Sequence, residues 1–228
     1  MQKRLNKITF GKKRFDAIIC LDTKLPGKPI FSKFPEIPLL AADGAAIKLI
    51  KMDIMPDFVV GDLDTFYTNP LSASISDKSK IIKETEQETN DFEKVLRFAK
   101  KKGFNKLLVF GFHGGELEHT LNNWSVLMRF AREMNLCIYD KKRYGIPVFN
   151  SFTMDLKKGE LVSLLPQQRT LLSTKGLKWE LKNEILELGR REGARNIAVT
   201  GNFGITIHEG SLLLFIDERF PYAPDFEV

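Results

Sequence analysis

Two carboxylates separated by one residue follow an apolar run in the first half of the chain. The run Phe58–Val60 stops at Gly61, and Asp62 and Asp64 come directly after it. Residues two apart on an extended chain point to the same side, so both carboxylates can face one ion. Mg²⁺ prefers oxygen ligands and usually keeps water or substrate phosphate as its other partners. The spacing predicts a magnesium site here, with a solvated acidic turn as the alternative interpretation of the motif alone.

Further carboxylates lie where other strands are expected to end or where helices are expected to begin. The whole set is Asp43, Asp62, Asp64, Glu86, Glu88 and Asp91. A parallel sheet would gather them at one edge, where they repel one another unless a cation neutralises them. The sequence has no phosphate-binding Gly-x-x-x-x-Gly-Lys-Ser/Thr loop, and its histidines lack the spacing of a zinc site. Magnesium-assisted transfer of a phosphate-containing group fits best, and Gly114-Gly115 would let backbone N–H groups approach a phosphate or a base.

The elements that would position these residues alternate between strands and helices. Short apolar runs predict strands at Ala17–Leu21, Leu39–Ala42, Phe58–Val60, Ile81–Ile82, Leu107–Phe110 and Leu136–Tyr139. We expect helices after Asp43-Gly44, after Thr89-Asn90 and near Thr120–Glu133. This alternation predicts an α/β fold with a mainly parallel, Rossmann-like sheet flanked by helices. Ligands of such sheets bind beyond the carboxyl ends of the strands.

The pattern changes after about residue 147. The strands expected there are short, are separated by Gly, Pro and Asn, and lie at Leu161–Leu165, Ile197–Thr200, Ile205–His208 and Leu212–Ile216. No helix of comparable quality lies between them. We therefore expect two domains, an α/β domain over residues 1–147 and a smaller all-β sandwich domain over residues 148–228.

Charge and composition exclude several classes of protein. Six basic residues and no acidic ones lie within residues 1–14, and the 29 remaining basic residues equal the 29 acidic ones. We therefore expect a solvated basic N-terminal arm and no nucleic-acid partner. No apolar run is long enough for a membrane span or a signal peptide, and Cys20 and Cys137 sit inside apolar runs as free thiols. The expected location is the cytoplasm, without membrane association.

Five stretches, in order along the chain, resemble motifs of the thiamine pyrophosphokinase family. They lie at residues 42–45 (ADGA), 56–65 (PDFVVGDLDT), 86–94 (EQETNDFEK), 111–122 (GFHGGELEHTLN) and 173–181 (STKGLKWEL). The family forms are Ala-Asp-Gly-Gly, Pro-Asp…Gly-Asp-x-Asp-Ser, Asp-Gln-Asp-x-Thr-Asp-Phe-x-Lys, Gly-x-x-Gly-Gly-Arg-x-Asp-His…Asn and Gly-Leu-x-Trp-x-Leu. Asn196 also matches the Asn of a Ser-Asn pair.

This resemblance implies a thiamine diphosphokinase, which transfers pyrophosphate from ATP to the hydroxyl of thiamine and gives thiamine diphosphate and AMP. It implies Mg²⁺ as cofactor and ATP as co-substrate, both bound by residues 1–147. Asp62, Asp64 and Asp91 would hold the metal or position the alcohol, and Asp43 would support the metal or ATP. The nucleotide contacts that it implies come from Gly44, Gln87, Lys94, Gly114, Gly115, His119 and Asn122.

For residues 148–228 the resemblance implies thiamine binding. Trp179 would stack on the pyrimidine of thiamine, and Asn196 would hydrogen-bond it. A flat aromatic face suits a planar, electron-poor or cationic ring, although a core tryptophan is the alternative when the residue is considered alone. The family also implies a homodimer with the site between subunits.

The chain departs from the family pattern at several positions. Glu116 stands where the family has Arg, which reverses a charge beside the expected phosphates. The other departures are Glu86, Glu88, Asn90, Glu118 and Arg195. Small displacements of a reacting group can be costly in catalysis. Two alternatives therefore stay open, namely a divergent relative that uses another nucleotide or alcohol, and a thiamine- or nucleotide-binding protein with little catalysis.

Overall fold

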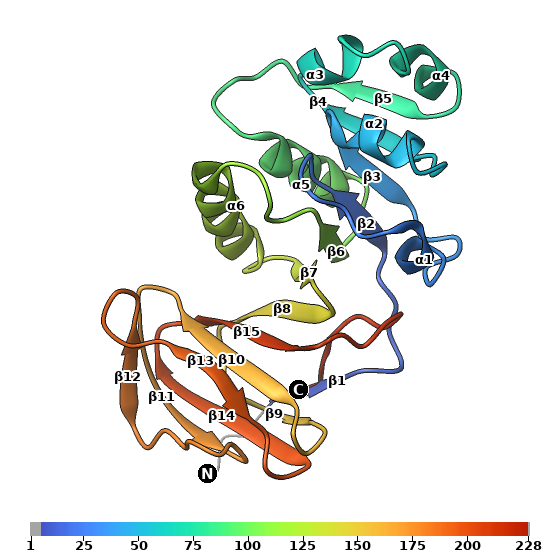
Figure 1. Ribbon diagram of the computed structural model, residues 1–228. Coiled ribbons are helices and arrows are strands. Elements are labelled where there is room, and N and C mark those ends of the chain that lie inside the picture. Colours follow the sequence, from blue (N-terminus) through green and yellow to red (C-terminus); the bar gives the residue numbers. More distant parts are fainter. Residues whose placement is uncertain (1–5, 228) are drawn as a thin grey trace. The chain divides into compact units, whose positions relative to one another are not determined.

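The computed structural model describes residues 6–227, which form two compact units (Figure 1). The α/β unit comprises residues 14–140, and the β unit combines residues 6–13 with residues 141–227. This division differs from the expected boundary at residue 147 and from the placement of the N-terminal residues with the α/β part. The physical reason is that β1 (Asn6–Thr9) and the strand at Arg143–Val148 both hydrogen-bond to strands of the β unit.

The α/β unit is built on parallel strands in the order β7-β6-β2-β3-β4-β5. Their bounds are β2 (Ala17–Cys20), β3 (Leu39–Ala42), β4 (Phe58–Gly61), β5 (Lys80–Lys83), β6 (Lys106–Phe110) and β7 (Asn135–Asp140). Every residue of β2 and β3 is buried, as expected for inner strands of a sheet that is covered on both faces. The predicted mainly parallel sheet with flanking helices is confirmed.

The helices of this unit are α1 (Lys28–Phe31), α2 (Ala45–Ile50), α3 (Asp64–Tyr67), α4 (Ser72–Ser76), α5 (Asp91–Lys101) and α6 (Leu117–Phe130). α5 begins where the sequence predicts it, because the side chain of Asn90 caps the helix by accepting from the Glu93 N–H. Its buried apolar face packs on β3 and β4. α6 begins at Leu117, ahead of the expected Thr120. None of the helices described within residues 6–227 is long and apolar enough to cross a membrane.

The β unit contains two groups of hydrogen-bonded strands, in the orders β12-β11-β14-β9-β1-β16 and β13-β10-β15-β8. Their bounds are β8 (Arg143–Val148), β9 (Phe152–Asp155), β10 (Leu161–Pro166), β11 (Arg169–Lys175), β12 (Glu184–Glu187), β13 (Gly193–Ile197), β14 (Asn202–Glu209), β15 (Leu212–Asp217) and β16 (Asp225–Glu227). The predicted smaller all-β domain is confirmed. One strand was misplaced, because β13 ends at Ile197, where the sequence pattern placed its start.

Residues 6–9 of the expected basic arm form a strand of the β unit, while the basic side chains of residues 7, 12, 13 and 14 are exposed as expected. β1 pairs in parallel with β9 and antiparallel with β16. Lys7 Nζ lies 3.1 Å from Asp155 Oδ2, and Lys12 Nζ lies 3.0 Å from Glu227 Oε1. These basic side chains therefore form ion pairs on the surface of the β unit. The basic residues at positions 3 and 4 lie outside the described residues.

A buried ion pair holds the segment that follows β15. Both carboxylate oxygens of Glu160 accept hydrogen bonds from Arg219 Nη2 at 2.6 Å. The same oxygens accept the backbone N–H groups of Asp217 and Lys157, each at 3.1 Å. The Glu160 side chain is fully buried, so these donors replace the water that its charge has lost.

We expect Glu160→Ala to lower the free energy of unfolding by about 3–5 kcal/mol, because the largely buried Arg219 charge would lose its partner. The control is Glu209→Ala. Glu209 pairs with Arg169 at 2.8 Å on an exposed surface, so its loss should cost about 0–1 kcal/mol. Denaturant unfolding measures both variants, and equal losses would contradict a special role for the buried pair.

Candidate active site

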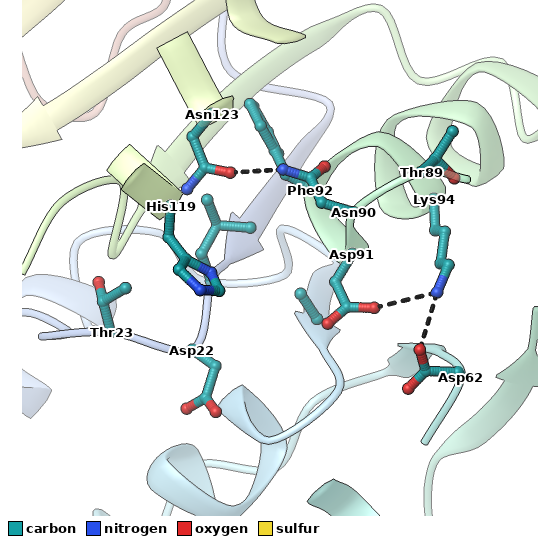
Figure 2. Close-up of a pocket in the computed structure, with 12 residues that line it drawn as sticks. Asp22, Thr23, Asp62, Thr89, Asn90, Asp91, Phe92, Lys94, His119 and Asn123 are labelled. Carbon is teal, nitrogen blue, oxygen red and sulfur yellow. Dashed lines mark hydrogen bonds and ion pairs between the residues drawn. The ribbon is translucent and has the colours of Figure 1, made fainter. Parts of the chain in front are cut away.

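A cavity of about 270 Å³ opens at the carboxyl ends of β2, β3 and β4 (Figure 2). Its lining residues lie at the ends of these strands or directly after them, in α6, or in α5 and the two residues before it. They are Leu21, Asp22, Thr23, Ala42, Asp62, Thr89, Asn90, Asp91, Phe92, Lys94, His119 and Asn123. The cavity thus lies at the sheet edge where α/β proteins bind ligands.

Lys94 lies between two carboxylates of this cavity (Figure 2). Its Nζ is 3.0 Å from Asp62 Oδ2 and 3.6 Å from Asp91 Oδ1, and its side chain is only 4% exposed. The hydrogen bond from Lys94 lowers the pKa of Asp62. Burial lowers the pKa of Lys94, but the hydrogen bond to Asp62 and the charges of both carboxylates outweigh burial and raise it. Lys94 and Asp62 therefore both stay charged at neutral pH.

Asp91 has a buried oxygen that no hydrogen bond satisfies. This oxygen is Oδ1, which lies 3.6 Å from the Lys94 ammonium. Desolvation raises the pKa of Asp91 to about 6, the charges of Asp43 and Asp62 act in the same direction, and Lys94 opposes them. An ionised carboxylate in such surroundings is stabilised by a bound cation.

Asp43 is buried and uses its carboxylate within the protein. Oδ1 accepts the backbone N–H of Phe66 at 3.0 Å, and Oδ2 accepts that of Thr65 at 3.3 Å. These N–H groups lie in the first turn of α3, where the helix cannot satisfy them itself. The backbone of Asp43 has a φ of 41°, which turns the chain directly after β3. Asp43 therefore fixes the turn that carries Asp62 and Asp64.

The other residues expected in the α/β site divide between the cavity and its surroundings. His119 lines the cavity, and Gln87 Nε2 lies 3.5 Å from Asp62 Oδ2. Asp64 is exposed at the start of α3 and is not part of the lining. The remaining expected residues outside the lining are Gly44, Gly114, Gly115 and Asn122.

Gly44 lies against Asp22, a cavity residue that the sequence analysis did not assign to the site. A Cβ at position 44 would lie 2.4 Å from Asp22 Oδ2, so only glycine lets the Asp22 carboxylate sit there. Asp22 Oδ1 lies 2.7 Å from Lys48 Nζ, which holds the carboxylate on that side. The position of Asp22 directly after a predicted strand was the signal that could have identified it.

Asn123, the neighbour of the expected nucleotide contact Asn122, lines the cavity. Asn122 is exposed, whereas Asn123 is buried and lines the cavity. Asn123 shares a face of α6 with the buried Val126 and Leu127. The helical period was therefore the signal that distinguishes the two neighbours.

Two contacts join α5 to α6 beside the cavity. Asn90 Nδ2 donates to Asn123 Oδ1 at 3.0 Å (Figure 2). The buried Glu93 accepts from Arg129 Nη2 at 2.5 Å. The Asn90 side chain therefore both caps α5 and links it to α6. Both contacts fix the first turn of α5, where Asp91 lies.

We expect Asn90→Ala to lower the free energy of unfolding by about 1–3 kcal/mol, because it removes both the cap and the link to Asn123. Asn90→Thr keeps a capping oxygen but loses the link, so its cost should be about 1 kcal/mol. Denaturant unfolding of the two variants separates the contributions. Full stability of the Thr variant would show that the link to α6 contributes nothing.

The predicted magnesium ligands are only partly brought together. Within residues 6–227, no three or more His, Cys, Asp or Glu side chains form a group placed to hold a metal ion. Asp62 and Asp91 nevertheless suit a hard cation, because both offer oxygen and Asp91 Oδ1 lacks a hydrogen bond. Two carboxylates match the way Mg²⁺ is held when waters and substrate phosphates complete its shell.

In the β unit, Trp179 and Asn196 are brought into direct contact. Asn196 Oδ1 accepts the backbone N–H of Trp179 at 3.2 Å, and Asn196 Nδ2 donates to the backbone carbonyl of Trp179 at 2.7 Å. The Trp179 side chain is nevertheless exposed, at 55%, so the alternative of a core tryptophan is excluded. Lys178 Nζ lies 4.8 Å from the centre of the indole. A buried amide thus fixes the backbone of an aromatic residue whose ring is accessible.

Two family models match this chain. The model described as thiamin pyrophosphokinase, catalytic domain, matches residues 37–139, and the model described as thiamin pyrophosphokinase, vitamin B1 binding domain, matches residues 151–214. The chain belongs to the thiamin pyrophosphokinase family. Both the predicted family and the prediction of an enzyme are confirmed. Asp62, Asp91 and Lys94 fall within the catalytic-domain match, and Trp179 and Asn196 fall within the vitamin B1 binding match.

Individual relatives agree with this assignment. Thiamine pyrophosphokinase 1 of Oryza sativa subsp. japonica is 28% identical over 196 residues, which cover 78% of this chain and 70% of the relative. The crystal structure of yeast thiamin pyrophosphokinase is similar with a TM-score of 0.75 and 18% identity, over 91% of this chain and 87% of that chain. The Bacillus subtilis thiamine pyrophosphokinase structure gives a TM-score of 0.73 and 17% identity, over 90% and 99%. The structural likenesses support the fold.

Proposed function

We propose that this protein catalyses the magnesium-dependent transfer of pyrophosphate from ATP to the hydroxyl of thiamine, giving thiamine diphosphate and AMP. The observation that carries the proposal is the cavity at the strand ends, where Lys94 lies between Asp62 and Asp91. The family supports it, because its two matched models name a thiamin pyrophosphokinase catalytic domain and a vitamin B1 binding domain.

Asp62 and Asp91 would hold Mg²⁺, and Asp64 stays a predicted third ligand. When bound, the cation neutralises negative charge on the phosphate oxygens. Lys94 keeps Asp62 ionised and oriented through its 3.0 Å contact. Asp43 holds the turn between β4 and α3, so that Asp62 stays at the cavity. In phosphoryl transfer such positioning and charge neutralisation usually dominate over base strength.

Nucleotide binding is proposed for Gln87, Lys94, His119 and the loop at Gly114 and Gly115, with Gly44 and Asn122 as predicted contributors. Gly114 has a φ of 117°, a conformation that favours glycine, and it precedes α6 in the chain. Glu116, which replaces the family's Arg, lies 3.2 Å from His119 Nε2 through Oε2. Glu116, where the chain departs from the family pattern, therefore contacts His119, which lines the cavity.

Thiamine binding is proposed for the exposed indole of Trp179, which offers a π-face to a planar, cationic ligand. Asn196 uses its amide on the backbone of Trp179, so we propose that it supports binding by holding that residue. We further propose that the active form is a homodimer with its sites between subunits. Sedimentation equilibrium tests this, and a catalytically active monomer would contradict it.

The test of the reaction is an assay with Mg²⁺, thiamine and each of the four common nucleoside triphosphates, followed for thiamine diphosphate. Product with ATP supports the proposal and makes Glu116 a tolerated change. Product only with another nucleotide would show that this nucleotide, and not ATP, is the donor. It would also indicate that the loop of Glu116 determines nucleotide specificity. If calorimetry shows thiamine binding and no nucleotide gives product, the proposed reaction is contradicted and the protein is a thiamine-binding protein.

A further inference from the structure

We propose that Glu180 is a positioning residue for Trp179, because its carboxylate closes the loop formed by residues 174–181 and holds the indole ready for the thiamine ring. The inference rests on the proposed function, and specifically on stacking of thiamine by Trp179. The family resemblance gave Glu180 no role. The residue is itself exposed and lies directly after Trp179 in the chain.

Three donors from the loop converge on the Glu180 carboxylate. Oε1 accepts the N–H of Gly176 at 2.6 Å and the N–H of Leu177 at 3.2 Å. Oε2 accepts the hydroxyl of Thr174 at 2.8 Å. The Thr174 oxygen in turn accepts the Leu181 N–H at 2.8 Å, so the bonds run from one end of the loop to the other. A charged acceptor makes such bonds shorter and stronger than a neutral one.

The other side of the loop is held by the chain around β13. Asn196 binds both the N–H and the carbonyl of Trp179, and the Val199 N–H donates to the Gly176 carbonyl at 2.9 Å. Gly176 has a φ of 94°, and a Cβ there would lie 2.4 Å from the Asn202 carbonyl oxygen. The loop backbone is therefore fixed on both sides while the indole stays exposed. A pre-ordered aromatic loses little freedom when a ligand binds.

Glu180 acts in this arrangement through its shape more than through a direct attraction between its charge and thiamine. Both of its oxygens already accept loop donors. A Gln side chain keeps one acceptor for Gly176 and Leu177, and its amide can donate to the Thr174 oxygen. An Asp side chain keeps the charge but is shorter by one methylene. If Glu180 positions the loop, Glu180→Gln should bind thiamine more tightly than Glu180→Asp. If its charge attracts thiamine, Glu180→Asp should bind more tightly.

The experiment titrates thiamine into the full-length protein by calorimetry and measures steady-state kinetics for the same variants. We expect Glu180→Ala and Glu180→Asp to weaken thiamine binding about 10-fold, and Glu180→Gln about 3-fold. The KM for ATP and the kcat at saturating thiamine should stay within about 2-fold, because the α/β unit is untouched. Time-resolved anisotropy of Trp179, measured in a Trp124→Phe background, should show a more mobile indole in the Ala variant.

Matched variants separate this inference from the function on which it rests. Glu192 accepts the Gly189 N–H at 2.8 Å in another loop of the β unit, so Glu192→Ala should leave thiamine binding unchanged. Unchanged thiamine affinity in Trp179→Ala would remove the proposed role of Trp179 itself. Weakened binding in Trp179→Ala with normal affinity and anisotropy in Glu180→Ala would overturn the inference alone.

A folding defect in Glu180→Ala leaves the inference testable. Thr174→Val removes the hydroxyl that joins Glu180 to Leu181, whereas Thr174→Ser keeps it. Weaker thiamine binding in the Val variant and near-normal binding in the Ser variant would support positioning. Equal binding in these two variants, together with equal binding in Glu180→Asp and Glu180→Gln, would overturn it.

Discussion

Asp91→Asn is expected to lower turnover by about 10²- to 10³-fold while it makes the metal-free protein more stable. In the proposed reaction this carboxylate would hold Mg²⁺, yet its buried Oδ1 has no hydrogen bond. The raised pKa of Asp91, about 6 against 3.8, means that its ionised form destabilises the folded state. This cost grows as the pH rises through that interval and is fully present at pH 8.

Asparagine removes the charge and keeps the shape, so we expect the free energy of unfolding to rise by about 1 kcal/mol at pH 8 in EDTA, after allowance for partial exposure. Denaturant unfolding and initial-rate kinetics measure the two effects. Asp53→Asn is the control, because the Asp53 side chain is 90% exposed and should affect neither quantity. A less stable Asp91→Asn protein, or one with normal turnover, would contradict this role of Asp91.

Lys94→Met is expected to reduce turnover by a similar factor, about 10²-fold or more, but to lower stability. Lys94 is the buried ammonium that the two carboxylates share, so its loss leaves Asp62 and Asp91 repelling each other. We expect the free energy of unfolding to fall by about 2–3 kcal/mol, which is below the usual cost of a broken buried pair because both carboxylates keep some exposure. The control on the same helix is Lys100→Met, which removes an exposed pair with Glu133.

The double variant Lys94→Met/Asp91→Asn tests whether the two effects share one cause. If the cost of Lys94→Met comes from uncompensated carboxylates, removing the charge of Asp91 should recover part of the lost stability. The expected coupling is about 1 kcal/mol, within the usual range for residues in contact. Strict additivity of the two single changes would show that Lys94 stabilises the fold through its packing and not through the cavity charges.

Much of the α/β unit could be predicted because its signals are local. Asn90 followed by a helical apolar face located α5, and runs such as Leu39–Ala42 located inner strands. The same reasoning placed Asp62 and Asp91 near each other, since strand ends and helix starts meet at one edge of a parallel sheet. Lys94 entered the expected site only through the family resemblance. Asp22 and Asn123 were not assigned to the site, although Asp22 directly follows a predicted strand and Asn123 shares the helical period of Val126 and Leu127.

The N-terminal strand could not be predicted because its partners are remote in sequence. β1 pairs with residues 152–154 and 225–227, and the local sequence of residues 6–9 does not predict those contacts. Asp43 shows a second limit of sequence reasoning. Its motif indicated a metal or nucleotide contact, but the hydrogen bonds to Thr65 and Phe66 depend on how the next strand and turn fold back over it.

The most direct test of the proposed reaction is to measure both products at once. Purified protein would be incubated with ATP, thiamine and Mg²⁺, and AMP and thiamine diphosphate would be quantified together by chromatography, with EDTA in a parallel sample. Transfer of an intact pyrophosphate predicts AMP and thiamine diphosphate in equal amounts and neither product in EDTA. Formation of ADP with thiamine monophosphate, or of AMP without thiamine diphosphate, would contradict the proposed function.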